Sequence, residues 1–151
     1  MGYGFPAAMG AQVGCPDSIV IDIAGDGSIQ MNIQELATVV LRKIPVKIII
    51  LNNGYLGMVR QWQELFYDKR YAFTVLTEDE NVMCPDFVKL AESYGAKGFR
   101  ATKKDEVDKV IQAALDAEGP VVVDIHIERE ENVFPMVPAG ESISNMMHGL
   151  S

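Results

Sequence analysis

The sequence contains little cysteine and no long apolar run. Its two cysteines, Cys15 and Cys84, are each followed by proline and lack the spacing of metal ligands, so we expect buried or inert thiols in a reducing compartment. No apolar stretch reaches the ~18 residues that a membrane-crossing helix needs, and no signal-peptide pattern is present. We therefore expect no membrane partner, and a cytoplasmic location, or an organelle if an upstream targeting segment was removed.

Basic residues are also scarce. The chain has 13 lysines and arginines against 21 aspartates and glutamates, which gives a formal net charge of −8. Nucleic acids and anionic membrane surfaces attract basic faces, so we expect neither as a partner. A chain of this charge that binds phosphate must do so locally, through a metal ion or main-chain N–H groups. Hydrophobic residues make up 48% of the 151 residues, which is enough for one globular domain with a substantial core.

The hydrophobic periodicity alternates between strand and helix. Short runs rich in Ile and Val predict buried strands over 18–24, 46–51 and 120–127. Helical spacing predicts helices over 31–42, 87–94 and 103–117. This alternation predicts an α/β domain with a doubly wound, mostly parallel sheet and helices on both faces. In such sheets, ligands bind beyond the carboxyl ends of the strands.

The two ends of the sequence differ from this pattern. The small, glycine-rich residues 1–14 predict a closely packed helix with no strand in front of it. We expect residues 1–127 to form the α/β domain, lacking its first strand. Residues 128–151 contain Pro135, Pro138 and Gly140 before the segment SISNMMHGL, and they predict a tail with one short helix.

Polar residues follow two of the predicted strands. Gly25-Asp26-Gly27-Ser28 ends the first, and Asn52-Asn53-Gly54-Tyr55 ends the second. If these strands are neighbours, a carboxylate, an amide oxygen and main-chain carbonyls meet at one edge, a set that suits Mg²⁺ with substrate phosphates. The glycines allow close approach of phosphate, and the N–H groups of Gly27 and Ser28 are placed to donate to it.

Each of these features also has a purely structural interpretation. A lone Gly-Asp-Gly is favoured by any strand-to-helix turn. Met58 and Trp62, four residues apart, would form one apolar helix stripe in the core, which the residues alone favour. His126 is expected to lie in the core with its hydrogen bonds satisfied. Arg60 is expected either to form an exposed ion pair or to meet a substrate carboxylate.

The two polar segments, read together, resemble the signature of thiamine-diphosphate enzymes, in which they anchor the cofactor diphosphate through Mg²⁺. GDGSIQMNIQELATVV and LNNGYLGMVRQWQELFY are similar to the acetohydroxyacid (acetolactate) synthase family, as are MGYGFPAAMGA and ENVFPMVPAG. The resemblance covers nearly the whole chain. In that family it corresponds only to the carboxyl-terminal diphosphate-binding domain of the catalytic subunit, which also contains pyrimidine-binding and FAD-binding domains.

The resemblance implies roles for individual residues. Mg²⁺ would be bound by the side chains of Asp26 and Asn53 and the main-chain carbonyl of Tyr55. The cofactor would contact Gly25, Gly27, Ser28, Leu56, Met58 and Met1. Met58 and Trp62 would line the pocket for substrate and herbicides. No catalytic residue is expected in this chain, because the family's activating glutamate belongs to the pyrimidine-binding domain.

The implied reaction is decarboxylation of pyruvate and ligation of the two-carbon unit to a second 2-ketoacid, in branched-chain amino-acid biosynthesis. The full-length subunit would also bind FAD, form a homodimer or larger assembly, and associate with a regulatory subunit. We expect this chain alone to be inactive. Two alternatives stay open: another thiamine-diphosphate enzyme, such as glyoxylate carboligase, pyruvate oxidase or a decarboxylase, or a non-enzymatic dimerising fragment. Gln61-Trp62-Gln63 after Leu-Gly-Met-Val-Arg favours the synthase.

Overall fold

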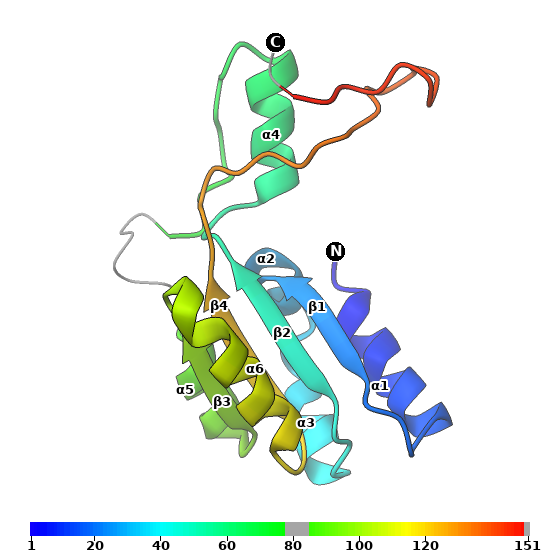
Figure 1. The fold of residues 1–151 in the computed structure, drawn as a ribbon, viewed down its shortest axis with the longest axis vertical. Coiled ribbons are helices and arrows are strands. Elements are labelled where there is room, and N and C mark those ends of the chain that lie inside the picture. The colour runs from blue at the N-terminus through cyan, green and yellow to red at the C-terminus, as the bar shows by residue number, and fades with distance from the viewer. Residues whose placement is uncertain (78–84, 150–151) are drawn as a thin grey trace.

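The computed structural model describes residues 1–77 and 85–149, and within them the chain forms one parallel sheet (Figure 1). Its four strands have the order β1-β2-β4-β3. Their bounds are β1 Ile21–Gly25, β2 Lys47–Asn52, β3 Lys97–Ala101 and β4 Val121–His126. All neighbouring strands pair in parallel, which confirms the predicted α/β class.

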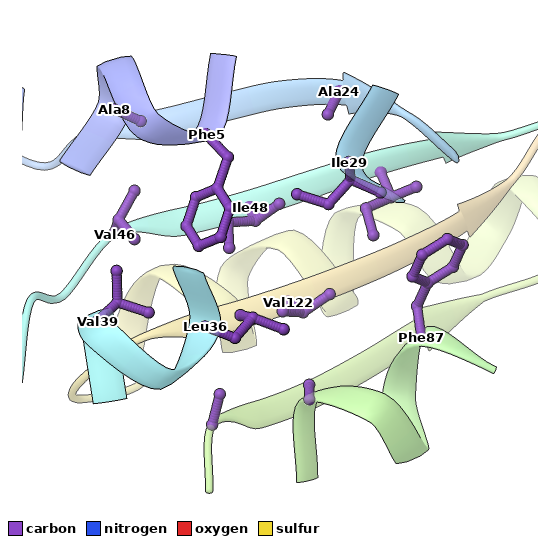
Figure 2. Packing of buried hydrophobic residues seen from close by; sticks show 13 residues of the cluster. Phe5, Ala8, Ala24, Ile29, Leu36, Val39, Val46, Ile48, Phe87 and Val122 are labelled. Atoms are coloured by element: carbon purple, nitrogen blue, oxygen red, sulfur yellow. The ribbon is translucent and has the colours of Figure 1, made fainter. Parts of the chain in front are cut away.

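Helices cover both faces of this sheet. The helices of the described residues are α1 Gly4–Gly14, α2 Asp26–Ile29, α3 Glu35–Leu41, α4 Gly57–Phe66, α5 Phe87–Tyr94 and α6 Val107–Asp116, with short 3-10 turns η1 Gln30–Asn32 and η2 Lys104–Glu106. On one face, side chains of α1, α2, α3 and α5 pack against Ile48, Ile50 and Val122 (Figure 2). On the other face, α6 packs against Ile49 and Val123. Alternate residues of β2 therefore serve two separate cores, which explains its continuous apolar sequence.

The three predicted strands are present, and β3 is a fourth that the sequence pattern did not predict. β3 is a short edge strand, and its sequence, KGFRA, lacks an apolar run. Gly98 lies so close to α5 that a Cβ atom there would be 2.9 Å from the main-chain carbonyl oxygen of Val88. Close packing against α5 therefore requires glycine at this position of the strand, although glycine in a sequence commonly signals a loop.

The predicted helix over 31–42 is shorter than expected, because the chain first forms η1 and enters α3 only at Glu35. The predicted helix over 87–94 is confirmed as α5. The side chain of Asp86 caps its first turn by accepting from the main-chain N–H of Lys89, and Gly95 ends it with φ of +92°.

The helix expected in the tail is wrong for the part of the tail that the structure describes. Residues 128–149 form bends, turns and irregular segments, and Met136 pairs with Met147 in an antiparallel bridge. The hydroxyl groups of Ser142 and Ser144 bond to each other, and Asn145 donates to Glu141. Such short polar side chains compete with helical hydrogen bonding.

The structure also bears on the cysteines and on the expectation about membranes. Cys15 is exposed, so of the expected buried or inert thiol only the inert alternative stays open there, and Cys84 lies outside the described residues. Across 1–77 and 85–149, none of the helices has the length and apolar character needed to cross a membrane.

Helix α4 and the tail lie together beyond the carboxyl end of the sheet, away from the helices that cover its faces (Figure 1). The segment that follows β4 crosses α4 in this view. This part of the molecule therefore stands above the strand ends, where ligands bind in parallel α/β sheets.

Candidate functional site

The carboxyl ends of β1 and β2 bring the two predicted polar segments together. The strands are direct neighbours, with Gly25 opposite Leu51. Asp26, the next residue after β1, is 3% exposed, and its Oδ2 accepts a hydrogen bond from the main-chain amide of Gly54 at 3.1 Å. The predicted adjacency of the two segments is therefore present.

The carboxylate of Asp26 lies in an environment that favours a cation. Burial raises the pKa of Asp26, while hydrogen bonds from nearby main-chain N–H groups, including those of Gly27 and Gly54, oppose this rise. In the described ranges 1–77 and 85–149, no lysine or arginine forms an ion pair with it. A buried carboxylate without a cationic partner is costly. A divalent cation at this position would remove that cost, so the residues present fit a Mg²⁺ site.

The two asparagines have different environments. Asn52 is 2% exposed, and its Nδ2 donates to Oδ1 of Asp124 at 2.9 Å. Asn53 is half-buried; its Oδ1 accepts from the main-chain amide of Tyr55 at 3.1 Å, and its Nδ2 donates to the main-chain oxygen of Arg129 at 3.4 Å. Asn52 is thus engaged with Asp124, and Asn53 is the asparagine that lies beside the cavity described next.

A cavity of about 270 Å³ lies at this edge of the sheet. Its lining includes every residue predicted to bind the cofactor or the metal: Met1, Gly25, Asp26, Gly27, Ser28, Asn53, Tyr55, Leu56 and Met58. It also includes Leu51, Gly57, Val59 and Ile127, which the sequence analysis did not select. The structure brings the predicted set together, while the role of each residue stays a prediction.

Gly27 is packed closely against the ends of two leucine side chains. A Cβ atom there would lie 2.7 Å from Cδ2 of Leu56 and 3.1 Å from Cδ1 of Leu76. The neighbouring Ser28 hydroxyl accepts a hydrogen bond from the main-chain amide of Gly2 at 3.0 Å. The turn after β1 is therefore packed closely between the first residues of the chain and the segment after β2.

A second cavity, of about 660 Å³, lies along α4 and the residues that follow it. It is lined by Met58, Val59, Trp62, Gln63, Tyr67 and Arg70. Met58 also lines the first cavity, so the two spaces share a wall. Trp62 is half-buried and meets Phe66 edge-on, with ring centroids 5.5 Å apart.

The buried residues of α4 are Arg60 and Gln61, not Met58 and Trp62. The apolar stripe that the residues alone would place in the core therefore faces a cavity. Arg60 is only 7% exposed and pairs with Glu64 at 3.2 Å and Glu130 at 2.9 Å. The expected ion pair is present, but its arginine is buried, while the side chain of Glu130 is 60% exposed.

Asp124 is a buried residue that the sequence analysis missed. It is completely buried, and besides Asn52 it contacts Arg100 Nε at 3.1 Å and His126 Nε2 at 3.3 Å. His126 is satisfied as expected, although its side chain is 24% exposed. The available signal was an aspartate inside the otherwise apolar run VVVDI.

The described residues contain no group of three or more His, Cys, Asp or Glu side chains that would hold a metal ion. The predicted site does not require such a group, because it uses one carboxylate, one amide oxygen and one main-chain carbonyl. Mg²⁺ commonly completes such a set with water and substrate phosphates.

Comparison with known proteins gives consistent matches. The family model described as "Thiamine pyrophosphate enzyme, C-terminal TPP binding domain" matches residues 1–125. The chain is 47% identical over 151 residues to the acetolactate synthase isozyme 2 large subunit of Escherichia coli, covering 100% of this chain and 27% of that protein. It is 48% identical over 147 residues to the acetolactate synthase large subunit of Pyropia yezoensis, covering 97% and 24%.

Similar matches extend to plants and to a solved structure. The chloroplastic acetolactate synthase 3 of Brassica napus is 45% identical over 149 residues, which covers 97% of this chain and 23% of that one. A thiamine diphosphate-dependent 4-hydroxybenzoylformate decarboxylase from Rhodococcus jostii superimposes with a TM-score of 0.74 at 34% identity, covering 87% of this chain and 24% of the other. The chain thus spans about a quarter of the length of these proteins.

Proposed function

The chain belongs to the family of C-terminal, thiamine pyrophosphate-binding domains of thiamine pyrophosphate enzymes, and on that basis we propose that it forms the Mg²⁺- and diphosphate-binding part of an acetolactate synthase. The relatives named above as acetolactate synthase large subunits support the choice of reaction, since they match this chain over 97% to 100% of its length.

The single observation that carries the proposal is the contact between Asp26 and Gly54 beside the cavity. It places a buried carboxylate, which has no cationic side-chain partner within 1–77 and 85–149, next to Asn53 and Tyr55. Asp26 and Asn53 would hold Mg²⁺ through their side chains, and Tyr55 through its main-chain carbonyl. The glycine-rich turn would receive the diphosphate, with the N–H groups of Gly27 and Ser28 as donors.

Thiamine diphosphate, when bound, supplies the electron sink for decarboxylation of a 2-ketoacid and for ligation of the product. This chain's part is to bind and orient that group. Asp26 supplies negative charge to the cation, and Leu56, Met58 and Met1 form an apolar wall around the cavity. Trp62 and Met58 line the larger cavity, which would take the 2-ketoacid substrates and the herbicides of the family.

The remaining functions belong to the full-length subunit. Its reaction would join pyruvate to a second 2-ketoacid in branched-chain amino-acid biosynthesis, in the cytoplasm or in an organelle such as the chloroplast of the plant relatives. FAD and the activating glutamate would come from other domains, and a regulatory subunit would bind the complete enzyme. The isolated 151-residue chain would therefore not turn over pyruvate.

Association into a dimer or larger assembly is part of this proposal. Ile21 and Ile23 of β1 are 44% and 69% exposed, and Ile19, just before the strand, is 67% exposed. Clustered apolar exposure of this kind is typical of surfaces that are covered in an assembly. Sedimentation of the chain at high concentration should show self-association; a clean monomer would contradict it.

A decarboxylase is the second candidate, since the solved structure with a TM-score of 0.74 carries that activity in its name. Its identity to this chain is 34%, against 47% and 48% for the synthases. In a complete enzyme containing this domain, pyruvate would give acetolactate if the synthase proposal holds, and acetaldehyde if the decarboxylase alternative holds.

The test of the proposed site is calorimetric titration of the chain with thiamine diphosphate, with and without Mg²⁺. We expect binding that requires Mg²⁺ and is lost in Asp26→Ala. Asp17→Ala, which changes an exposed aspartate outside the cavity, is the matched control and should bind like the wild type. Binding that is unaffected by Asp26→Ala or by omission of Mg²⁺ would refute the proposed site.

A further inference from the structure

Arg129 contacts the turn that carries the proposed metal ligands, although it lies far away in the sequence. Its main-chain oxygen accepts a hydrogen bond from Nδ2 of Asn53, 76 residues earlier, at 3.4 Å. Its guanidinium carbon lies 4.6 Å from the ring centroid of Tyr55. A guanidinium N–H of the same side chain donates to the main-chain oxygen of Thr77 at 2.9 Å. One residue therefore touches both Asn53 and Tyr55.

These contacts determine which atoms the turn presents. Because Nδ2 of Asn53 donates to Arg129, the amide group is oriented and its oxygen stays on the opposite side, where it also accepts from Tyr55 N–H. The ring of Tyr55 is held by two cations, since the guanidinium carbon of Arg60 lies 5.5 Å from the same centroid. Cation–π contacts within ~6 Å are attractive and strengthen on desolvation.

The segment that follows Arg129 is fastened to α4. Glu130 pairs with Arg60 at 2.9 Å, and Asn132 donates to Glu64 at 3.0 Å. The buried side chain of Gln61 donates to the main-chain oxygen of Val133 at 2.9 Å and accepts from its N–H at 2.8 Å. Arg129 is thus held at a defined place by contacts on its carboxyl-terminal side.

We propose that Arg129 is a positioning residue that orders the Asn53–Tyr55 turn and thereby sets the geometry of the metal and diphosphate site. This inference rests on the proposed function. Arg129 would act through Asn53 and Tyr55, without itself touching the cofactor. Residues that orient metal ligands in this way contribute about 10- to 100-fold to metal affinity.

Two variants of the 151-residue chain separate charge from shape. Arg129→Ala removes the guanidinium group, and Arg129→Lys keeps the charge but loses the planar group that lies over the Tyr55 ring. Arg42→Ala, at an exposed arginine that ends α3, is the matched control. Circular dichroism and urea unfolding establish that each variant is folded.

The first measurement is amide hydrogen exchange of Gly54, Tyr55 and Leu56 without cofactor. Loss of the cation–π contact should speed this exchange about three- to thirtyfold in Arg129→Ala, with a smaller rise in Arg129→Lys and none in Arg42→Ala. The second is titration with thiamine diphosphate and Mg²⁺, in which Arg129→Ala should weaken binding about tenfold or more.

The outcomes distinguish this inference from the proposed function. Unchanged exchange in Arg129→Ala would overturn the inference whether or not the cofactor binds, as would faster exchange with unchanged cofactor affinity. A wild-type chain that does not bind cofactor would refute the proposed function. In that case, faster amide exchange in Arg129→Ala than in the wild type would still support Arg129 as the residue that orders the turn.

Discussion

The main-chain amide of Gly54 donates to Oδ2 of Asp26 at 3.1 Å, across 28 positions of the sequence. This bond connects the turn after β1 to the turn after β2. It also orients a carboxylate that is 3% exposed and lines the cavity at this edge of the sheet. Substitutions that disturb the packing around this bond should therefore alter the site.

Gly27→Ala should weaken cofactor binding with little effect on folding. The new Cβ atom would lie 2.7 Å from Leu56 Cδ2 and 3.4 Å from Met1 Cε, both at the ends of flexible side chains that line the 270 Å³ cavity. Repacking these ends costs about 1 kcal/mol. It narrows the cavity, so Mg²⁺-dependent binding of thiamine diphosphate should fall about tenfold or more.

The matched control is Gly10→Ala in α1, where a Cβ atom has nothing within 4 Å. That variant should bind like the wild type and be slightly more stable, because alanine favours a helix. Equal cofactor affinity for Gly27→Ala and Gly10→Ala in the calorimeter would show that the turn at Gly27 is not part of the binding site.

Asp22 should make the chain less stable as pH rises. Asp22 is 6% exposed on β1, and within the described residues its Oδ2 has no hydrogen-bond partner. Burial raises the pKa of Asp22 above its ordinary 3.8. The folded state therefore binds the proton more tightly than the unfolded state. The stability that Asp22 contributes is complete below pH 3.8 and is lost as pH rises through the raised pKa. Over that range the free energy of unfolding falls by at most about 1.4 kcal/mol per pH unit.

Urea unfolding at a series of pH values tests whether the free energy of unfolding falls as pH rises. Asp22→Asn should remove part of the decline in the free energy of unfolding above pH 3.8. It should not remove all of it, because burial also raises the pKa of Asp26. Asp17→Asn, at an exposed aspartate, should leave the profile unchanged. An Asp22→Asn profile parallel to that of the wild type would contradict the assignment.

Gln61 and Gln63 allow a direct comparison of part-buried and exposed hydrogen bonds. Each side chain both donates to and accepts from the main chain of one distant residue: Gln61 with Val133, and Gln63 with Ala72. Gln61 is 2% exposed, whereas the bonds of Gln63 lie at the surface. Gln61→Ala leaves the part-buried main-chain N–H and C=O of Val133 without this partner, at up to about 1–3 kcal/mol each.

Water can replace the bonds of Gln63, so Gln63→Ala should destabilise by less than about 1 kcal/mol. Guanidinium unfolding of both variants measures the difference in the free energy of unfolding. Equal losses would mean that Val133 finds other partners, and that the tail is not fastened to α4 through Gln61.

The site was predictable where it depends on strand order alone. In a parallel sheet, turns that follow neighbouring strands lie at one edge, so Gly25–Ser28 and Asn52–Tyr55 are predicted to meet once their two strands are taken as neighbours. The resemblance to thiamine-diphosphate enzymes adds Leu56, Met58 and Met1, which line the same cavity.

The contacts of Asp124 and Arg129 were not predictable in this way. Their asparagine partners, Asn52 and Asn53, lie 72 and 76 residues away, and no periodic pattern links these pairs. β3 was missed because an edge strand with lysine, glycine and arginine has no apolar signature. The prediction of a helix in the tail was wrong because Ser142, Ser144 and Asn145 form local side-chain hydrogen bonds. Such bonds compete with helical hydrogen bonding, and whether they form depends on conformation as well as on composition.

Trp62→Leu should change acceptor selection in a complete synthase subunit that contains this domain. Trp62 lines the 660 Å³ cavity together with Met58, and its indole is held edge-on against Phe66 at 5.5 Å. Replacing the indole enlarges the cavity. Differences in the fit of one methylene are worth about 1–3 kcal/mol, so the ratio of acetolactate to acetohydroxybutyrate formed from mixed 2-ketoacids should change about tenfold.

Phe73→Leu, at a fully exposed aromatic outside the cavity lining, is the control and should leave the ratio unchanged. The ratio is measured at fixed concentrations of both acceptors, so that a general loss of activity does not alter it. If Trp62→Leu and Phe73→Leu give the same ratio as the wild type, the cavity along α4 does not receive the second substrate, and Trp62 serves only to pack against Phe66.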